Sequence, residues 1–235
     1  MTPASPSQRT GGGFSHLVVT ASWVVVLCLT THYVSTRALR FLVVTPQAYG
    51  LYFWPRASWL LLHVLAGLVA IGTGLPQFWP RLRRDHVKVH RVVGRVYLSS
   101  VVLGGATGLF LATTSRVTPT YAAGLAFLSV AWLTTSGMAF AAILNRNVDQ
   151  HKQWMIRSYV VTLAFVSFRL GEDVLAYWGI GTKADRLSVM SWACWAVPLL
   201  FTEIAFQARP VFLGRRAAPT GDWSRAFEPR IGGPA

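Results

Sequence analysis

Six long runs of apolar residues decide what this chain can fold into. Because unpaired backbone groups are costly in lipid, helices are the structure that such runs favour. Each run is close to the roughly 20 apolar residues that a helix needs to cross a bilayer. The sequence therefore predicts an all-α, polytopic transmembrane bundle of about six spanning helices. The runs cover about 17–36, 57–79, 91–113, 120–144, 154–178 and 187–207.

Composition supports a membrane protein over a soluble or nucleic-acid-binding one. The chain is 53% hydrophobic and 13% charged, which is too apolar for an ordinary soluble domain. Its net charge of +14 comes from basic residues in short turns between apolar runs, with no continuous aromatic and basic face. We therefore predict the lipid bilayer, and not nucleic acid, as the partner. Cys28 and Cys194 each lie inside an apolar run and are expected to be packing residues.

Three regions are expected along the chain. Residues 1–15 and 208–235 are rich in Gly, Pro and small or basic residues and are predicted to be flexible tails around one transmembrane domain, 16–207. With six spans and a cytoplasmic N-terminus, 15 of the 22 Lys and Arg residues fall on the cytoplasmic side and six on the other. This bias predicts that both termini are cytoplasmic, in a cell inner membrane.

Histidine and glycine are paired in the second and third runs, as His63-x3-Gly67 and His90-x3-Gly94. An ionisable group is costly beside lipid and a nearby glycine leaves room, so both helix faces should pack against protein. Since successive spans alternate in direction, His63 and His32 fall toward one leaflet, and His90 and His151 toward the other. Bis-histidine haem b proteins use two such layers. The candidate haem-binding residues are His90 with His151, His63 alone or with His32, and Gly67 and Gly94 beside them.

The fifth run carries the most polar helical face. Arg169 and Glu172 stand three residues apart and can form an ion pair, which lowers the cost of holding either in the membrane. Glu203, in the sixth run, has no partner expected within its own helix, so Arg157 or Arg95 is predicted to serve it. The predicted intramembrane polar network consists of Arg169, Glu172, Asp173, Glu203, Arg157 and Gln77.

Several motifs resemble a known family. They are His63-x3-Gly67 through Gly74-x2-Gln77-Phe78, His90-Arg91-x2-Gly94-Arg95-x-Tyr97, His151-x2-Trp154-Met155-x-Arg157-Ser158-Tyr159, and Arg169. In this order they resemble domain of unknown function 2306, a family of predicted bacterial membrane proteins, over residues 57–207. The resemblance implies a multi-pass membrane protein and brings no reaction, substrate or cofactor. Leu199 stands where the family usually has Asn, which implies one fewer polar contact in the sixth span.

Three functions from different classes follow from these residues. The first is a haem-b electron carrier, which a looser likeness in pattern to cytochrome b561-type bundles favours. The second is a small proton-coupled transporter with Arg169, Glu172 and His63 along the pathway, which requires a water-accessible cavity. The third is a non-catalytic membrane subunit or assembly factor, with the basic turn at 81–95 as a docking surface for another membrane or redox protein or for a lipid headgroup.

Other chemistries find no support in the sequence. His86 and His90 are one turn apart, but no carboxylate or thiolate completes a ligand set, so no metal site is predicted. Nucleophile-elbow, P-loop, dinucleotide-binding and zinc-protease motifs do not occur, and no catalytic residue is assigned.

Overall fold

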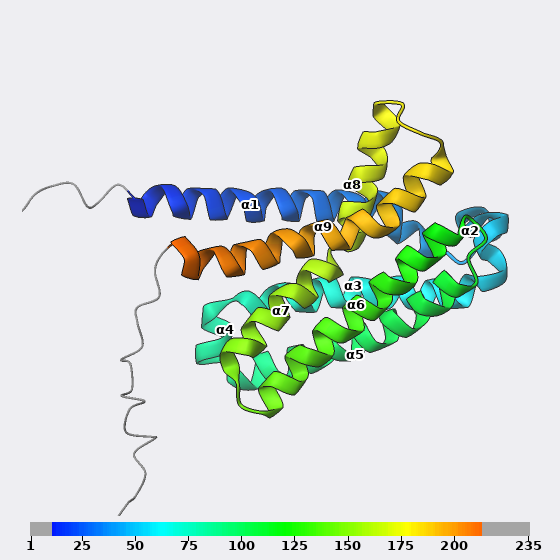
Figure 1. Cartoon of the computed structure of the whole chain (residues 1–235). Helices are drawn as coiled ribbons and strands as arrows, with labels where there is room; N and C mark the ends of the chain where they lie inside the picture. Colours follow the sequence, from blue (N-terminus) through cyan, green and yellow to red (C-terminus); the bar gives the residue numbers. More distant parts are fainter. Residues whose placement is uncertain (1–10, 213–235) are drawn as a thin grey trace, which may run out of the picture. The chain divides into compact units, whose positions relative to one another are not determined.

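A computed structural model describes residues 11–212, and every regular element in that range is a helix (Figure 1). The chain divides into two compact units, Met1–Leu199 and Leu200–Ala235. The predicted tails lie mostly outside the described residues, although α1 begins at Gly11 and α9 continues to Phe212. In chain order the elements are α1 (Gly11–Tyr33), η1 (Val34–Ala38), η2 (Leu39–Leu42), α2 (Pro46–Phe53), η3 (Trp54–Arg56), α3 (Ala57–Gly74), η4 (Leu75–Phe78), α4 (Pro80–Asp85), α5 (Val87–Thr113), α6 (Pro119–Leu144), α7 (Val148–Thr162), α8 (Ala164–Tyr177) and α9 (Lys183–Phe212).

The prediction of an all-α, polytopic membrane protein is confirmed. Four helical stretches in the described part are long and apolar enough to cross a membrane: Pro46–Phe78, Val87–Thr113, Pro119–Leu144 and Lys183–Ala208. They correspond to the second, third, fourth and sixth predicted spans. The total of six spans stays a prediction. It needs α1 as the first span, and it needs α7 and α8 together as the fifth.

Local sequence explains where the helices of the bundle begin. Thr118 caps α6 by accepting a hydrogen bond from the Tyr121 backbone N–H at 3.0 Å, with Pro119 in the first turn. Asn147 caps α7 in the same way, through the Gln150 backbone N–H at 3.1 Å. Pro80 keeps the preceding Trp79 extended, which separates the end of η4 from α4.

The fifth predicted span is broken in its middle. α7 has 15 residues and α8 has 14, and Leu163 between them leaves the helical region with ψ at 2°. Neither half reaches the length needed to cross a bilayer. The break contains no proline or glycine. Instead, the Thr162 hydroxyl donates to the Ser158 carbonyl at 2.9 Å, and such back-bonding side chains bend helices.

α3, α5, α6 and α7 form the packed centre of the first unit. Their core is built from two buried tyrosines, Tyr97 and Tyr159, together with Trp132 and smaller apolar residues. Glycines allow the neighbouring helices to pack closely against each other. A Cβ added at Gly74 would lie 2.5 Å from the Tyr159 ring, and one at Gly104 would lie 2.8 Å from Trp132. These glycines therefore accommodate aromatic side chains of neighbouring helices.

Candidate functional site

A cavity of about 260 Å³ lies inside the first unit, beside the break between α7 and α8. Thr162, Ala164 and Phe165, which flank the break, all contribute to its wall. Most of the other lining residues are apolar and come from η1, η2, α3, α5, α6, α8 and α9. Two of the predicted functional groups, His63 and Arg169, also line this cavity. The cavity end of the bundle, as we call this region, is therefore the main candidate site.

His63 is fixed in one orientation by the helix opposite. Its Nδ1 lies 2.9 Å from the Gly104 carbonyl oxygen on α5. A carbonyl can only accept, so Nδ1 carries the proton and neutral imidazole keeps Nε2 as an acceptor. Gly108 makes room for the ring, since an added Cβ would lie 3.0 Å from Cε1 of His63.

Gly67 plays a different part from the one that its spacing to His63 suggests. It lines the cavity, and a Cβ added there would meet no atom within 4 Å. The glycines that fit around the His63 ring and its hydrogen bond are Gly104 and Gly108, on α5. Gly67 therefore contributes open space, while a neighbouring helix positions the histidine.

Arg169 forms the ion pair that its spacing to Glu172 predicts. Nη1 of Arg169 donates to Glu172 Oε2 at 3.1 Å, and the Glu172 side chain is only 14% exposed. The guanidinium carbon lies 5.4 Å and 5.7 Å from the ring centres of Phe168 and Phe165. At least one of its five donors is unpaired, because Nε of Arg169 is buried without a partner in the described structure. Arg169 therefore has a donor left over at the cavity wall.

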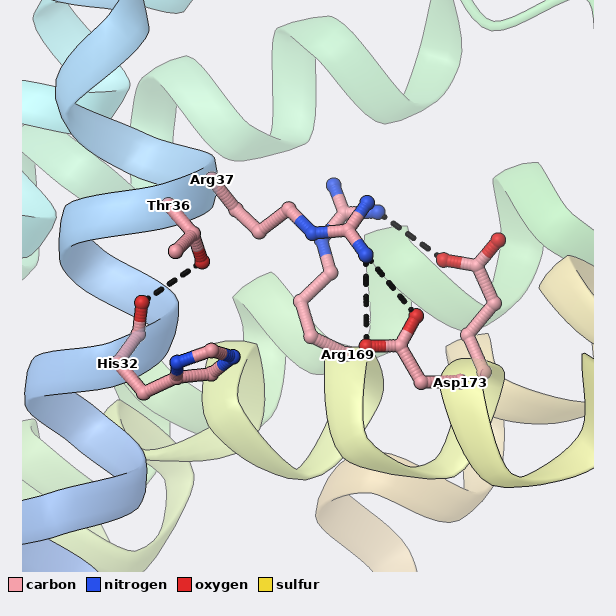
Figure 2. Close-up of polar contacts among 6 residues, drawn as sticks. His32, Thr36, Arg37, Arg169 and Asp173 are labelled. Atoms are coloured by element: carbon pink, nitrogen blue, oxygen red, sulfur yellow. Dashed lines mark hydrogen bonds and ion pairs between the residues drawn. The ribbon is translucent and has the colours of Figure 1, made fainter. Parts of the chain in front are cut away.

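A second ion pair lies next to the first, and it includes a residue that the sequence analysis missed (Figure 2). Nη2 of Arg37, on η1, donates to the two carboxylate oxygens of Asp173 at 3.1 and 3.4 Å. Both side chains are about two-fifths exposed, so the pair is worth little in isolation. The sequence contains one indication of this pair. Arg37 directly follows the first apolar run, and this end of the run is predicted to lie in the same leaflet as Asp173.

His32 does not join His63. Its ring packs edge-on against Tyr33 with centroids 5.0 Å apart, and its backbone carbonyl accepts from the Thr36 hydroxyl at 2.7 Å (Figure 2). His32 is exposed and does not line the cavity. The structure thus brings only one of the two predicted histidines of this layer to the cavity.

Next to the cavity, a network of hydrogen-bonded hydroxyl groups fills the centre of the bundle. Thr162 donates to Ser158 O and accepts from Trp132 Nε1, both at 2.9 Å. Because a hydroxyl has one proton, Tyr97 must donate to Thr162 (2.9 Å), Ser158 to Tyr97 (2.6 Å), and Ser136 to Ser158 (2.6 Å). Every proton in this chain has an acceptor. The sequence analysis did not identify Trp132 and Ser136, on α6, as part of a network, because their apolar run contains no charged residue.

His90, His151 and Gln77 gather at the other end of the bundle, which we call the basic end because the turn at 81–95 lies there. Nδ1 of His151 is 2.8 Å from the Ala139 carbonyl oxygen, and His90 interacts electrostatically with His151. Gln77 is 6% exposed and packs on Gly94, whose added Cβ would lie 3.3 Å from Gln77 Oε1. Nδ1 of His90 and Nε2 of Gln77 are both buried without a partner in the described range.

The two remaining network residues have local partners. The guanidinium of Arg157 lies 4.8 Å from the Trp154 ring centre, as a cation–π contact. Glu203 lies in the second unit, and its Oε1 accepts from Gln207 Nε2 at 3.1 Å. The expectation that Glu203 has no partner in its own helix is therefore wrong, because a glutamine one turn later reaches back to it.

Comparison with known protein families identifies a match over much of the chain. The model of a family described as predicted membrane proteins (DUF2306) matches residues 60–206, which include His63 and Arg169 of the cavity and Gln77 and His90 of the basic end. No curated protein and no solved structure matches the chain.

Proposed function

Because the chain belongs to this family of predicted membrane proteins, we propose a function inside the bilayer: binding a small, mainly apolar carboxylic acid in the cavity, for proton-coupled transport. The observation that carries the proposal is that Arg169 and His63 line one mainly apolar cavity. Nε of Arg169 is a buried donor without a partner in the described residues, and Nε2 of the neutral His63 ring is an acceptor. This is the transporter among the functions predicted from the sequence, with His63 and Arg169 in named roles.

Each polar group has a distinct task in this scheme. The carboxylate accepts hydrogen bonds from the Arg169 guanidinium, which stays charged at any relevant pH. The acid's proton passes to Nε2 of His63, so a neutral acid becomes a carboxylate beside an imidazolium and the net charge of the cavity is unchanged. Proton and anion are thereby bound together, which is the requirement for coupling their movement.

The size of the cavity and the broken helix support a small transported molecule. A volume of about 260 Å³ lies just below the roughly 300–1,000 Å³ typical of sites for drug-sized ligands. Discontinuous helices frequently border the substrate sites of secondary transporters. Leu163 interrupts its helix next to three cavity residues, so the break is where such a site is expected.

The proposal is tested by binding hexanoate to the purified protein in a neutral detergent. Titration calorimetry in two buffers of different ionisation enthalpy should detect about one proton taken up per hexanoate. His63→Gln should abolish the proton uptake. Arg169→Gln should weaken hexanoate binding about tenfold, the loss of one charge-assisted hydrogen bond. Arg116→Gln, at an exposed arginine in the turn between α5 and α6, is the matched control.

Binding of 1-hexanol separates a lost carboxylate contact from a lost fold. Arg169→Gln should bind 1-hexanol as the wild type does, because the apolar wall is intact. Equal binding of hexanoate and 1-hexanol by the wild type would remove the role given to Arg169. If neither binds, the third prediction, a non-catalytic membrane subunit, gains the support that the transporter loses.

Haem b is a second candidate, which the histidine geometry favours. Metal-binding histidines usually donate their second ring nitrogen to a carbonyl or carboxylate, and Nδ1 of both His63 and His151 lies against a backbone carbonyl. The iron of a haem would bind His63 in the cavity, or His90 and His151 at the basic end, and would supply one-electron transfer. The fit at the cavity is partial, since His63 is its only histidine and the volume is small for a tetrapyrrole. A Soret band in protein from haem-replete cells, lost in His63→Ala or His151→Ala, is the test.

The orientation belongs to the same proposal. Both termini and the basic end are assigned to the cytoplasmic face of a cell inner membrane, from the distribution of Lys and Arg. The Arg37–Asp173 pair would then lie at the opposite face. A cysteine introduced at the exposed Lys88 should react with a membrane-impermeant maleimide only after cells are opened.

A further inference from the structure

Two buried polar atoms at the basic end lack partners. Nε2 of Gln77 belongs to a side chain that is 94% buried, and Nδ1 of His90 is also buried. Neither atom has a hydrogen-bond partner among the described residues. Buried polar groups are almost always paired, so two unpaired ones at one end of a bundle indicate a missing ligand.

Packing places Gln77 against α5 about one helical turn from His90 along that helix. Gln77 contacts α5 at Gly94, and His90 precedes Gly94 by four residues on the same face of that helix. His151, from α7, interacts electrostatically with His90. Because its Nδ1 is held by Ala139, only Nε2 of His151 is left to face a ligand. Three helical elements thus contribute polar groups to one small region.

The surroundings of this region are strongly cationic. Six Lys and Arg residues lie between positions 81 and 95, and two of them, Arg83 and Arg91, interact electrostatically with His90. The one acidic residue of this turn, Asp85, is paired with Arg84 at 3.0 Å. An amide N–H and an imidazole N–H beside several guanidinium groups suit an anion with several acceptor oxygens.

We propose that Gln77 and His90 form a phosphate-binding site, with Arg83 and Arg91 supplying charge at its rim. The amide of Gln77 and the ring of His90 donate to phosphate oxygens, which satisfies both unpaired atoms. The phosphate belongs either to the headgroup of an anionic phospholipid or to a free phosphate ion. None of these residues lines the cavity, so this proposal can be tested independently of carboxylate transport.

The test compares lipids and salts on the full-length protein by thermal unfolding. Nanodiscs of phosphatidylcholine with 20–30% phosphatidylglycerol, on the order of a natural anionic content, are compared with nanodiscs of phosphatidylcholine alone. Sodium phosphate is compared with sodium chloride at equal ionic strength in neutral detergent. If phosphatidylglycerol raises the thermal midpoint and sodium phosphate does not, the ligand is a lipid headgroup. If both raise the midpoint, the site also binds free phosphate. No increase with either overturns the proposal.

Gln77→Met is the decisive variant because it removes the amide without changing charge or chain length. Binding, measured as the concentration that gives half of the midpoint shift, should weaken about tenfold. Gly94→Ala, which must displace the Gln77 amide, should weaken it in the same direction. Arg84→Gln removes a charge from the same turn and should have a small effect, since Arg84 is paired with Asp85. A full shift in Gln77→Met, or an equal loss in Arg84→Gln, would mean that general charge attraction explains the result.

Discussion

The two ends of the bundle treat their polar groups in opposite ways. At the cavity end the charged groups are paired with each other, as Arg37 with Asp173 and Arg169 with Glu172, and the adjoining space is apolar. At the basic end the charges lie on an exposed turn, while the buried amide and imidazole atoms are unpaired. Between them the hydroxyl network has an acceptor for every proton. On this basis the hydroxyl network is expected to be structural, and the unpaired atoms of Arg169, Gln77 and His90 belong to the two proposed sites.

The largest expected effect separates packed from open glycines. Gly74→Ala would place a Cβ 2.5 Å from Tyr159 and 2.9 Å from Tyr97, both buried. We expect about 3 kcal/mol of destabilisation, or a fall in the thermal midpoint of roughly 6–12 °C. Gly67→Ala, at the cavity, meets no atom within 4 Å and should leave the midpoint unchanged or slightly raised. Similar losses in both variants would mean that the cavity is filled in solution.

The second prediction compares the two ion pairs of the cavity end. Glu172→Gln leaves the Arg169 charge without its partner in a mostly buried setting and should cost about 2 kcal/mol. Asp173→Asn breaks the more exposed Arg37 pair and should cost less than about 1 kcal/mol. Thermal unfolding in neutral detergent measures both. A reversed order would show that the Arg37 pair is the structural one.

The third prediction concerns the centre. Tyr97→Phe removes one donor and one acceptor from the hydroxyl network and should cost about 1–2 kcal/mol, seen as a lower thermal midpoint. Hexanoate and phosphate binding should be unchanged, because Tyr97 itself lines neither the cavity nor the phosphate site. Tyr177→Phe, at a tyrosine that is 84% exposed, is the control. Loss of binding in Tyr97→Phe alone would connect the centre to function.

The smallest effect has the opposite sign. In neutral detergent without phosphate or anionic lipid, Gln77→Met should raise stability by up to about 1 kcal/mol, because it removes a buried unpaired amide. The same change should reduce the stabilisation that phosphatidylglycerol gives, in line with the tenfold weaker binding expected above. A stability loss without lipid would indicate that Gln77 already has a partner, such as a bound water.

The length of the apolar runs was enough to predict the helices, but it was not enough to predict the candidate site. The second, third, fourth and sixth runs became helices close to their expected bounds, because length and hydropathy alone decide such segments. The break at Leu163 could not be predicted, since no proline or glycine marks it and its cause is a hydroxyl held by residues on other helices. Spacing within one helix gave the Arg169–Glu172 pair. It could not give Arg37–Asp173, which depends on how distant helices meet.

Some single residues teach the same lesson. The i, i+4 rule joined Gly67 to His63, yet the hydrogen bond that orients the imidazole comes from Gly104 on another helix. Glu203 was expected to have no partner in its own helix, yet Gln207 one turn later donates to it. Periodicity identifies which residues share a face, and tertiary packing decides which of them touch.

The Arg37–Asp173 pair has a consequence for biogenesis. The two residues are 136 positions apart, and the chain is made from its N-terminus. Arg37 is therefore synthesised and delivered to the membrane long before Asp173 exists, and their contact can form only after the intervening helices have been inserted. The contact is thus a late step of assembly, and a ribosome-bound chain that stops before residue 173 would still carry an accessible guanidinium at position 37.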